Sequence, residues 1–318
     1  MRSALRLHAL IQVPNEIELH QYVFDNSVQQ ELHSDLQSLC TEYKATLVIL
    51  PENGGVSGAY AKACELVIQD NFDYLWLWDQ DSSPKPDCLT TLLSSFTQAQ
   101  KQSSLPLLGA VSPRLIDPSG KDNHYVFYSE PFDLLGMRTK RFPTHLILSG
   151  EVTSTFFVNS GTLLAKAVIA KVGAPDVDFF MDLVDFDYSS RIVSAGFRLI
   201  LNANTSVDHQ VGNPDTRVIM GLQLINRKYS NFRYYYQARN EILMAQKSKT
   251  PIRFTFRALV HLTLIAVRIV VTESCVFSKI LAFKIGIIDG LLGKKGKSYP
   301  KWIDSISPAK KLSSFNHG

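Results

Sequence analysis

An acidic turn in the first third of the chain has the residue types and spacing for metal chemistry. Asp79 and Asp81 stand two residues apart, where the apolar run YLWLW ends in a polar turn. Two carboxylates on one turn can converge on a divalent cation, and Mg²⁺ or Mn²⁺ bound to so few protein oxygens keeps positions open for phosphate oxygens. Short acidic turns are also common without a metal, so this pattern alone leaves a solvated turn as an alternative.

A second acidic cluster lies in FFMDLVDFDYSSR, where Asp182, Asp185 and Asp187 precede Arg191 near the start of a predicted helix. Acids in a first helical turn stabilise the helix dipole, which explains any one of them without a function. Asp185 differs, because aromatic and aliphatic neighbours would desolvate it and raise its pKa, as a general base requires. His209, in SVDHQVG, offers a third metal ligand, although a lone histidine is often structural.

The elements that would position these residues alternate between strands and helices. ATLVILPE is a β-rich run that leads through the glycine cluster NGGVSGAY into a helical pattern at AKACELVIQ, and a second unit runs from a buried strand ending at Asp79 to a helix over 86–98. This order predicts a parallel sheet with helices on both faces. Further strands are predicted in LLGAVSP, VTSTFFVNSG and FRLILN, and a helix over 183–195 that ends at Gly196.

The start of the chain is unusual for such a sheet. A short amphipathic helix over residues 5–11 precedes the strand that closes on Asp25. A leading helix normally crosses over from an earlier strand, so we expect either residues missing before Met1 or a sheet that is one strand short. Arg and His interrupt the apolar pattern of the first residues, which argues against a cleaved signal peptide and for a protein inside the cell.

The composition predicts a globular body joined to a basic C-terminal region. The 318 residues are 45% hydrophobic, which is ample for a large α/β domain and a smaller appendage. Four scattered cysteines without a C-x-x-C pair indicate neither a zinc site nor a disulfide framework. Residues 251–318 carry 11 Lys and Arg against 3 Asp and Glu, whereas the first 250 carry 22 against 26. We predict one domain over 1–212 and a helical region over 213–318.

Residues 251–300 are predicted to form helices that lie on a membrane surface. A spanning helix needs about 20 predominantly apolar residues, and this region is interrupted by Arg253, Arg257, Arg268, Lys279 and Lys284. Apolar side chains with interleaved basic ones suit interfacial helices whose Lys and Arg meet anionic headgroups. Packing of these helices against the rest of the chain is the alternative.

Together these segments resemble family 2 glycosyltransferases of the GT-A fold, most closely the bacterial rhamnosyltransferase-like members. The matching segments follow the family's order over most of residues 15–245, and they are FDNS, NGGVSGAYAKA, YLWLWDQDSSP, NSGTLL, FFMDLVDFDYSSR, DHQVG and RYYYQARN. The resemblance implies an α/β fold with a GT-A type nucleotide-sugar-binding sheet flanked by helices. It also implies a C-terminal helical membrane-associated extension, and a first strand that is missing from this chain.

The resemblance implies roles for the residues near the donor nucleotide. Asp25 would contact the nucleotide, and the loop beside it would be shaped by Asn53, Gly55 and Gly58. Arg191 would be a structural or phosphate-facing charge near the catalytic base.

The resemblance also implies the metal site and the base. Asp79 would face the ribose or the metal, Asp81 would ligate the metal, and His209 would complete the site. Asp185 would be the catalytic base, and the turn at 159–161 would line the donor or acceptor cleft. The implied cofactor is Mg²⁺ or Mn²⁺.

The implied activity is inverting transfer of a hexosyl group, with L-rhamnose from dTDP-L-rhamnose as the first donor to consider. The acceptor would be a lipid-linked glycan or polysaccharide in bacterial cell-surface glycan biosynthesis, such as that of O-antigen. The protein would be cytoplasmic and peripheral on the anionic inner face of the cell membrane, and no nucleic acid is expected as a partner.

Three other interpretations fit part of the sequence. NGGVSGAY is similar to a dinucleotide fingerprint, and Asp79 lies 21 residues after Gly58, but Asn53 stands where the first glycine belongs. A dehydrogenase also leaves Asp81 and His209 without a shared purpose. A strand followed by Asp-x-Asp suits phosphatases with an aspartate nucleophile. The last alternative is an N-terminally truncated, inactive membrane-associated remnant of a glycosyltransferase.

Overall fold

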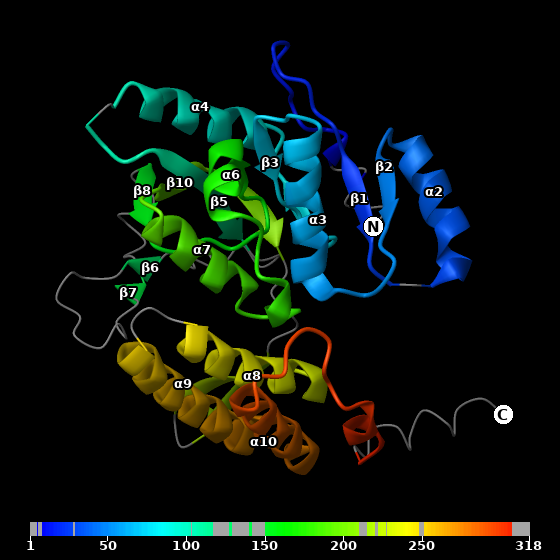
Figure 1. Ribbon diagram of the computed structural model, residues 1–318, viewed down its shortest axis with the longest axis vertical. Helices are drawn as coiled ribbons and strands as arrows, with labels where there is room; N and C mark the ends of the chain where they lie inside the picture. The colour runs from blue at the N-terminus through cyan, green and yellow to red at the C-terminus, as the bar shows by residue number, and fades with distance from the viewer. Residues whose placement is uncertain are drawn as a thin grey trace. The chain divides into compact units, whose positions relative to one another are not determined.

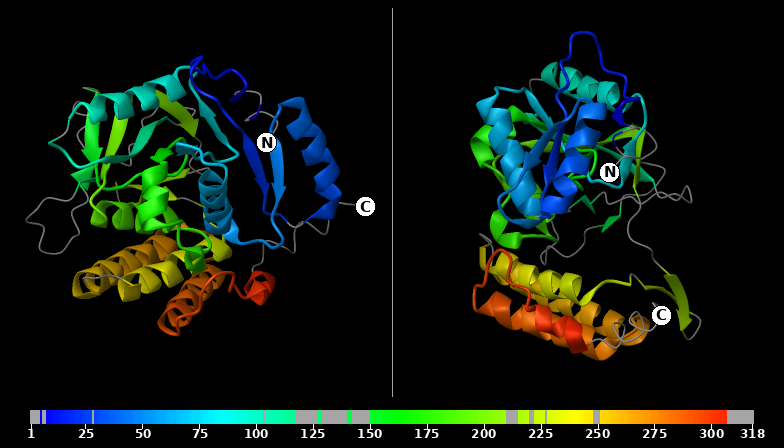
Figure 2. Two further views of the ribbon diagram at one scale, coloured as in Figure 1. Left: turned by 45° about the horizontal axis from the view of Figure 1, so that its top comes forward. Right: turned by 90° about the vertical axis from the view of Figure 1, so that its right-hand side faces the viewer.

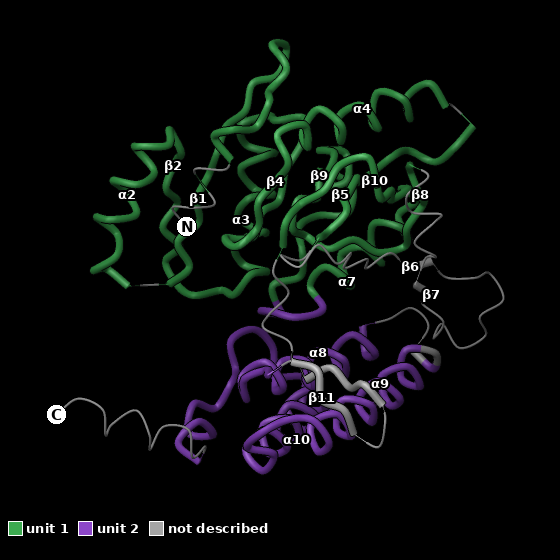
Figure 3. The backbone as a smooth tube through the Cα atoms, turned by 180° about the vertical axis from the view of Figure 1, so that it is seen from behind, with its two compact units in different colours: residues 1–130, 138–177, 184–210 green, residues 131–137, 178–183, 211–318 purple. Residues whose placement is uncertain are grey.

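The computed structural model (Figures 1 and 2) describes residues 5, 8–27, 29–102, 104–116, 127–128, 140–141, 150–209, 215–219, 222–226, 228–247 and 251–306. The chain forms two compact units (Figure 3): unit 1 comprises residues 1–130, 138–177 and 184–210, and unit 2 comprises residues 131–137, 178–183 and 211–318. Residues 178–183 therefore pack with unit 2, although they lie upstream of the predicted boundary near residue 212.

The main sheet of unit 1 has six strands in the order β3-β9-β5-β10-β4, with β8 also paired to β10. The strands are β3 (Tyr74–Trp76), β4 (Ser82–Pro84), β5 (Leu108–Ile116), β8 (Glu151–Ser154), β9 (Leu163–Ala165) and β10 (Arg198–His209). A further short pair is formed by β6 (Phe127–Tyr128) and β7 (Lys140–Arg141).

The prediction of a parallel sheet is wrong for this main sheet. Among its described strands, only β5 and β10 pair in parallel, while β9 runs antiparallel to β3 and β5, and β4 and β8 run antiparallel to β10. Parallel pairing requires a long crossover connection, usually a helix. The chain instead enters β9 from the loop at 155–162 that follows β8, so this strand joins the sheet without a helical crossover.

A second, parallel sheet consists of β1 (Tyr22–Asp25) and β2 (Thr46–Ile49). The 3-10 turn η1 (Gln30–Leu32) and helix α2 (His33–Glu42) connect these two strands. The sequence did not predict α2, because HSDLQSLCTE buries only Leu39 and Cys40 and has little apolar periodicity. Among the described residues this sheet does not pair with the main sheet, and the expectation of a missing strand stays a prediction.

Helices cover both faces of the main sheet, as the sequence predicts. They are α3 (Gly55–Gln69), α4 (Cys88–Gln100), α6 (Lys166–Val172) and α7 (Val184–Ser194), which ends just before Gly196. Neighbouring strand residues point to opposite faces: Ala110 packs with α3, α6 and α7, whereas Val111 packs with α4. The sheet is therefore the middle layer of three, as Figure 1 shows.

Unit 2 consists of a hairpin followed by three long helices. The hairpin strands are β11 (Asp215–Ile219) and β12 (Leu222–Asn226), and the helices are α8 (Asn231–Lys247), α9 (Pro251–Thr272) and α10 (Val276–Leu291). The 3-10 helix η3 (Lys301–Ile306) follows, and η2 (Val177–Phe179) lies where the chain first enters this unit. A helical region over 213–318 was predicted from the sequence, and its first described elements are instead the two strands of this hairpin. Tyr234, Leu262 and Phe283 form part of the core that joins the three helices.

Helix α9 has one buried face and one exposed apolar face. Its buried positions include Ala258, Leu262, Ile265 and Ile269, and its exposed apolar positions are Ile252, Phe256, Leu259, Leu264, Val267 and Val270. Residues Phe254–Thr272 are long and apolar enough to cross a membrane, with a mean hydropathy of 1.8 and 22% of the stretch buried. The charges in this region therefore do not exclude a span, contrary to the sequence analysis. Length and composition alone do not distinguish a span from an amphipathic helix.

Candidate active site

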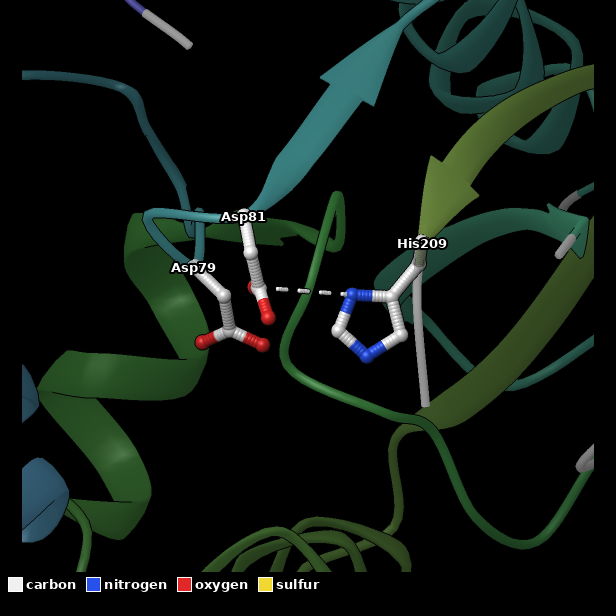
Figure 4. A group of neighbouring side chains, drawn as sticks. All are labelled: Asp79, Asp81 and His209. Atoms are coloured by element: carbon white, nitrogen blue, oxygen red, sulfur yellow. Dashed lines mark ion pairs between the residues drawn. The ribbon is translucent and has the colours of Figure 1, made fainter. Parts of the chain in front are cut away.

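Asp79, Asp81 and His209 come together beside the paired strands β4 and β10 (Figure 4). One ligand atom from each residue lies within 4.8 Å of the other two. The antiparallel register places Ser82 opposite His209, so that Asp81, one residue earlier, falls beside the imidazole with its Oδ1 atom 3.8 Å from Nδ1. The structure thus brings together the three residues that the sequence analysis assigned to a metal.

The donor set of this cluster fits a divalent cation. Carboxylate oxygens suit Mg²⁺ and Mn²⁺, and an added imidazole nitrogen favours a transition metal. The side chain of Asp81 is 56% exposed, so a cation held here would keep positions open toward solvent or a ligand.

Three hydroxyl groups hold these ligands in place. Ser82 Oγ lies 2.7 Å from His209 Nδ1 and also hydrogen-bonds the hydroxyl of Ser160. Tyr60 donates a hydrogen bond of 2.8 Å to Asp79 Oδ1. Such outer contacts orient metal ligands and tune their basicity. None of these three hydroxyls was assigned a role beside the metal from the sequence, although all three lie inside the quoted segments NGGVSGAYAKA, YLWLWDQDSSP and NSGTLL.

Tyr60 also connects the acidic turn to the second acidic cluster. Burial raises the pKa of the Tyr60 phenol well above its usual value, and the negative charges of Asp79, Asp185 and Asp81 raise that pKa further. The phenol therefore remains a neutral hydrogen-bond donor at neutral pH. The charges of Asp185 and of the acidic turn therefore act on one and the same phenol.

Asp185 stands in the first turn of α7, where its Oδ1 atom accepts a hydrogen bond of 3.0 Å from the backbone amide of Phe186. The rings of Phe156 and Phe186 lie 5.5 Å apart beside this turn, which provides the aromatic surroundings expected for a base. The expected rise in the pKa of Asp185 stays a prediction.

The other two acids of the cluster make ion pairs. Asp187 is buried and accepts a hydrogen bond of 2.8 Å from Arg191 Nε. Asp182, in unit 2, lies 3.1 Å from Arg233, and burial raises its pKa although the arginine charge opposes that rise. Arg191 also donates to the carbonyl groups of Val172 and Ala174. These contacts give Arg191 structural partners in unit 1. Its expected role as a phosphate-facing charge stays a prediction.

The turn at Asn159-Ser160-Gly161 belongs to a loop rather than to the strand predicted over VTSTFFVNSG, because β8 ends at Ser154. Gly161 has a φ of +80°, and a Cβ atom there would lie 2.8 Å from Pro113 Cγ and 2.9 Å from Val207 Cγ2. Its amide donates to the carbonyl of Leu77 at 2.8 Å. The turn is therefore held against the sheet, with Ser160 directed at Ser82.

The donor-side residues lie around the end of β1. Asp25 is only 5% exposed, and it accepts hydrogen bonds from the amide and hydroxyl of Ser27 at 2.9 and 2.7 Å. Burial alone would raise the pKa of Asp25, but these hydrogen bonds and His33, 3.1 Å away, lower it below its usual value. Asp25 is thus an ionised group that shapes this turn, and its contact with a nucleotide stays a prediction.

The glycine loop before α3 is held by two asparagines. Asn53 Oδ1 accepts a hydrogen bond of 3.0 Å from the amide of Gly55. Asn26, which the sequence analysis quoted in FDNS without a role, bonds the amide of Gly54 at 3.0 Å and the carbonyl of Gly55 at 2.7 Å. At Gly58 an added Cβ would meet nothing within 4 Å. The loop shape therefore depends on Asn26 and Asn53 more than on Gly58.

The sequence and the fold of this chain are similar to those of known proteins. Residues 7–152 match the family model of glycosyl transferase family 2. The chain is 23% identical over 292 residues to dTDP-rhamnosyl transferase RfbF of Shigella flexneri, which covers 91% of this chain and 92% of that protein.

Among solved structures, the fold is similar to GalNAc-T7 with UDP, GalNAc and Mn²⁺, with a TM-score of 0.52 and 13% identity over 96% of this chain. The chain spans 53% of that protein, about half its length. The fold is also similar to S. aureus TarS 1–349, with a TM-score of 0.52 and 9% identity over 97% of this chain and 80% of that one.

The fold and the family match define a glycosyltransferase of the GT-A fold. Residues 7–152 of the chain match the model of glycosyl transferase family 2, and the whole chain is similar to a protein named as a dTDP-rhamnosyl transferase. The family resemblance found in the sequence is confirmed.

Proposed function

We propose that the chain is an inverting hexosyltransferase that transfers L-rhamnose from dTDP-L-rhamnose. The observation that carries the proposal is the cluster of Asp79, Asp81 and His209, together with Asp185, whose charge acts on the Tyr60 phenol that bonds Asp79. The similarity to a protein named as a dTDP-rhamnosyl transferase, over nine-tenths of both chains, supports the choice of donor.

In the proposed reaction Asp185 accepts the proton of the acceptor hydroxyl while that oxygen attacks the anomeric carbon. The bond from this carbon to the nucleoside diphosphate breaks in the same step, so the anomeric configuration inverts. Asp79, Asp81 and His209 would hold Mg²⁺ or Mn²⁺, which supplies positive charge beside a diphosphate when it is bound. Tyr60 keeps the Asp79 carboxylate oriented through its hydrogen bond of 2.8 Å.

We infer that the acceptor is a lipid-linked glycan or polysaccharide of bacterial cell-surface glycan biosynthesis, including O-antigen. The enzyme would act as a peripheral protein on the cytoplasmic face of the cell membrane. The exposed apolar side chains of α9, together with the excess of basic residues after residue 250, support this location.

The contacts of α9 favour an interfacial helix over a spanning one. Arg257 pairs at 2.8 Å with the buried carboxylate of Glu241, and Arg268 lies over the rings of Tyr229 and Tyr234. Arg257 and Arg268 thus face away from the exposed apolar side chains of α9 and toward residues of α8 and Tyr229. Two lysines of GKKGK, by contrast, already pair with carboxylates: Lys294 with Asp289, and Lys295 with Asp178. These two lysines would contribute less to headgroup binding than lysines without a carboxylate partner.

A donor screen tests the proposed reaction. The purified chain with Mn²⁺ is incubated with a panel of dTDP-, UDP- and GDP-sugars, and release of nucleoside diphosphate is measured with and without lipid-linked acceptors extracted from bacteria. We expect the highest rate with dTDP-L-rhamnose, and Asp81→Ala serves as the control for non-specific hydrolysis. A faster rate with another sugar would refute the donor, and no release from any donor would favour the inactive remnant.

A further inference from the structure

The segment RYYYQARN, at the start of α8, carried part of the family resemblance but has no part in the proposed reaction. Two of its residues, Arg239 and Asn240, are 0% exposed in unit 2. A fully buried arginine is rare, because its charge is costly to remove from water unless hydrogen bonds compensate for the loss. The contacts of this pair therefore indicate what it does.

Arg239 and Asn240 donate hydrogen bonds to backbone carbonyl groups of residues 178–182. Arg239 donates to the carbonyls of Asp178 and Phe179, both at 2.9 Å. The Asn240 amide donates to those of Phe179 and Asp182, both at 2.9 Å, and to that of Met181. Arg239 also bonds the Asn240 side-chain oxygen at 2.9 and 2.8 Å, so the two side chains act as one unit.

The backbone that they hold is in an unfavourable conformation. Phe180, Asp182 and Leu183 have φ values of 62°, 54° and 61°, in the left-handed region that residues with a Cβ atom rarely adopt. Such conformations persist only where the surrounding contacts determine them, and they are concentrated at functional sites. Here those contacts come from Arg239 and Asn240, with a further ion pair of 3.1 Å between Arg233 and Asp182.

The strained segment leads directly into α7, which starts at Val184 and carries Asp185 in its first turn. Residues 178–183 belong to unit 2, as the colouring of Figure 3 shows, and the chain continues from Leu183 into α7 without a linker. The held segment is therefore covalently adjacent to the turn that carries Asp185.

We propose that Arg239 and Asn240 are positioning residues that hold residues 178–183 in their left-handed conformations and thereby place the Asp185 carboxylate for proton transfer. This inference rests on the proposed function, in which Asp185 is the base. It assigns to α8 a part in the reaction without contact between α8 and the substrate.

Hydrogen exchange tests the structural half of the inference without any activity measurement. Asn240→Ala removes the amide that bonds three carbonyl groups, and Tyr234→Phe, on the same helix, removes a buried hydrogen bond of 2.7 Å to Glu273 that does not touch this segment. We expect amides of residues 180–189 to exchange about tenfold faster or more in Asn240→Ala, and at the original rate in Tyr234→Phe. Equal exchange in both variants would refute the positioning role. If Asn240→Ala does not fold, Asn240→Ser, which keeps one donor, replaces it.

Kinetics test the link to Asp185. We expect Asn240→Ala to lower kcat by about 10- to 100-fold while KM for the donor changes by less than about twofold. In an Asp185→Asn background, Asn240→Ala should cost less than about a further twofold, because residues that act through one group are not additive. Independent, multiplying effects would overturn the inference. Full activity of Asp185→Asn alone would instead refute the assigned base, and the exchange result would still decide whether α8 holds this segment.

Discussion

The residues around the cluster of Asp79, Asp81 and His209 differ in what they contribute. Asp81 and His209 face each other across the β4–β10 pair, whereas Ser82 and Tyr60 act on them through hydrogen bonds. Asp185 belongs to a different element, the first turn of α7. The contributions of ligand, base and supporting residue can therefore be separated by single substitutions.

We expect Asp81→Ala to abolish metal-dependent transfer while the fold is retained. The side chain is 56% exposed, so its removal leaves no buried cavity, but it takes away a carboxylate that would bind the cation. Nucleoside diphosphate release measures transfer, and circular dichroism checks the fold. Chelator added to the unmodified protein should have the same effect, and full activity in chelator would contradict the metal assignment.

Asp185→Asn is nearly isosteric but cannot accept a proton, so transfer should fall by about 10²-fold or more while donor binding persists. Asp187→Asn is the matched control, because Asp187 pairs with Arg191 and should affect stability more than turnover. Rates under saturating donor and a binding assay with dTDP distinguish the two effects. A larger loss of rate in Asp187→Asn would show that the wrong carboxylate was assigned.

Ser82→Ala should weaken metal binding without removing a ligand. The Ser82 hydroxyl fixes the imidazole of His209 at 2.7 Å, and loss of such a contact typically costs about 10- to 100-fold in affinity. Calorimetric titration of each variant with Mn²⁺ alone measures the affinity for the metal. Ser83→Ala is the control, since Ser83 lies next to it on the same strand, opposite Asp208. Equal affinities of the two variants would refute the orienting role.

At the scale of elements, the site depends on how loops meet the sheet. The turn at 159–161 brings the Ser160 hydroxyl to Ser82, and this turn is held by the close approach of Gly161 to β5 and β10. A loop residue therefore sets the position of a hydroxyl beside the proposed metal ligand His209.

Gly161→Ala should destabilise the protein more than Gly196→Ala. Both glycines have positive φ, at 80° and 89°, but a Cβ at position 161 would lie within 3 Å of Pro113 and Val207, whereas at 196 it would meet nothing within 4 Å. Gly196→Ala should cost about 1 kcal/mol for its backbone alone, and Gly161→Ala about 1–3 kcal/mol more from overpacking. Thermal melts compare the two, and equal melting temperatures would contradict the close packing.

At the scale of the whole molecule, charge and apolar surface are unevenly distributed along the chain. The excess of basic residues lies after residue 250, where α9 also exposes a row of apolar side chains. Apolar area and attraction to anionic lipid strengthen membrane binding together. The same part of the chain would then localise the enzyme near a lipid-linked acceptor.

We expect the full chain to sediment with anionic liposomes and high salt to weaken that binding. Replacing exposed Leu259 and Val267 by Asp should abolish sedimentation, because the carboxylates oppose insertion of this face. Thr263→Asp on the same face is a control for added charge without loss of apolar area, and we expect a smaller effect. If neither the chain nor its variants bind liposomes, the membrane location and the lipid-linked acceptor are refuted together. Binding that only detergent reverses would indicate a spanning α9.

The sequence alone determined several of the local elements, including α3, α4 and α7, and which residues are candidates for chemistry. The periodicity of α3, α4 and α7 and the glycine at 196 are local signals, because a helix is formed by contacts within one segment. The acidic turn and His209 were recognised because metal ligands are few in type. The family followed from the order of these segments, which needs no knowledge of their contacts.

Only the tertiary structure decided which strands pair and which side chains support the site. Strand order and direction depend on hydrogen bonds between distant segments, so the antiparallel β9 and the β11–β12 hairpin were not predictable from their own residues. The contact of Ser82 with His209 and the hold of Asn240 on residues 179–182 likewise join segments far apart in the chain. A hydroxyl or an amide binds whatever partner folding brings within about 3 Å, and its sequence neighbours do not identify that partner.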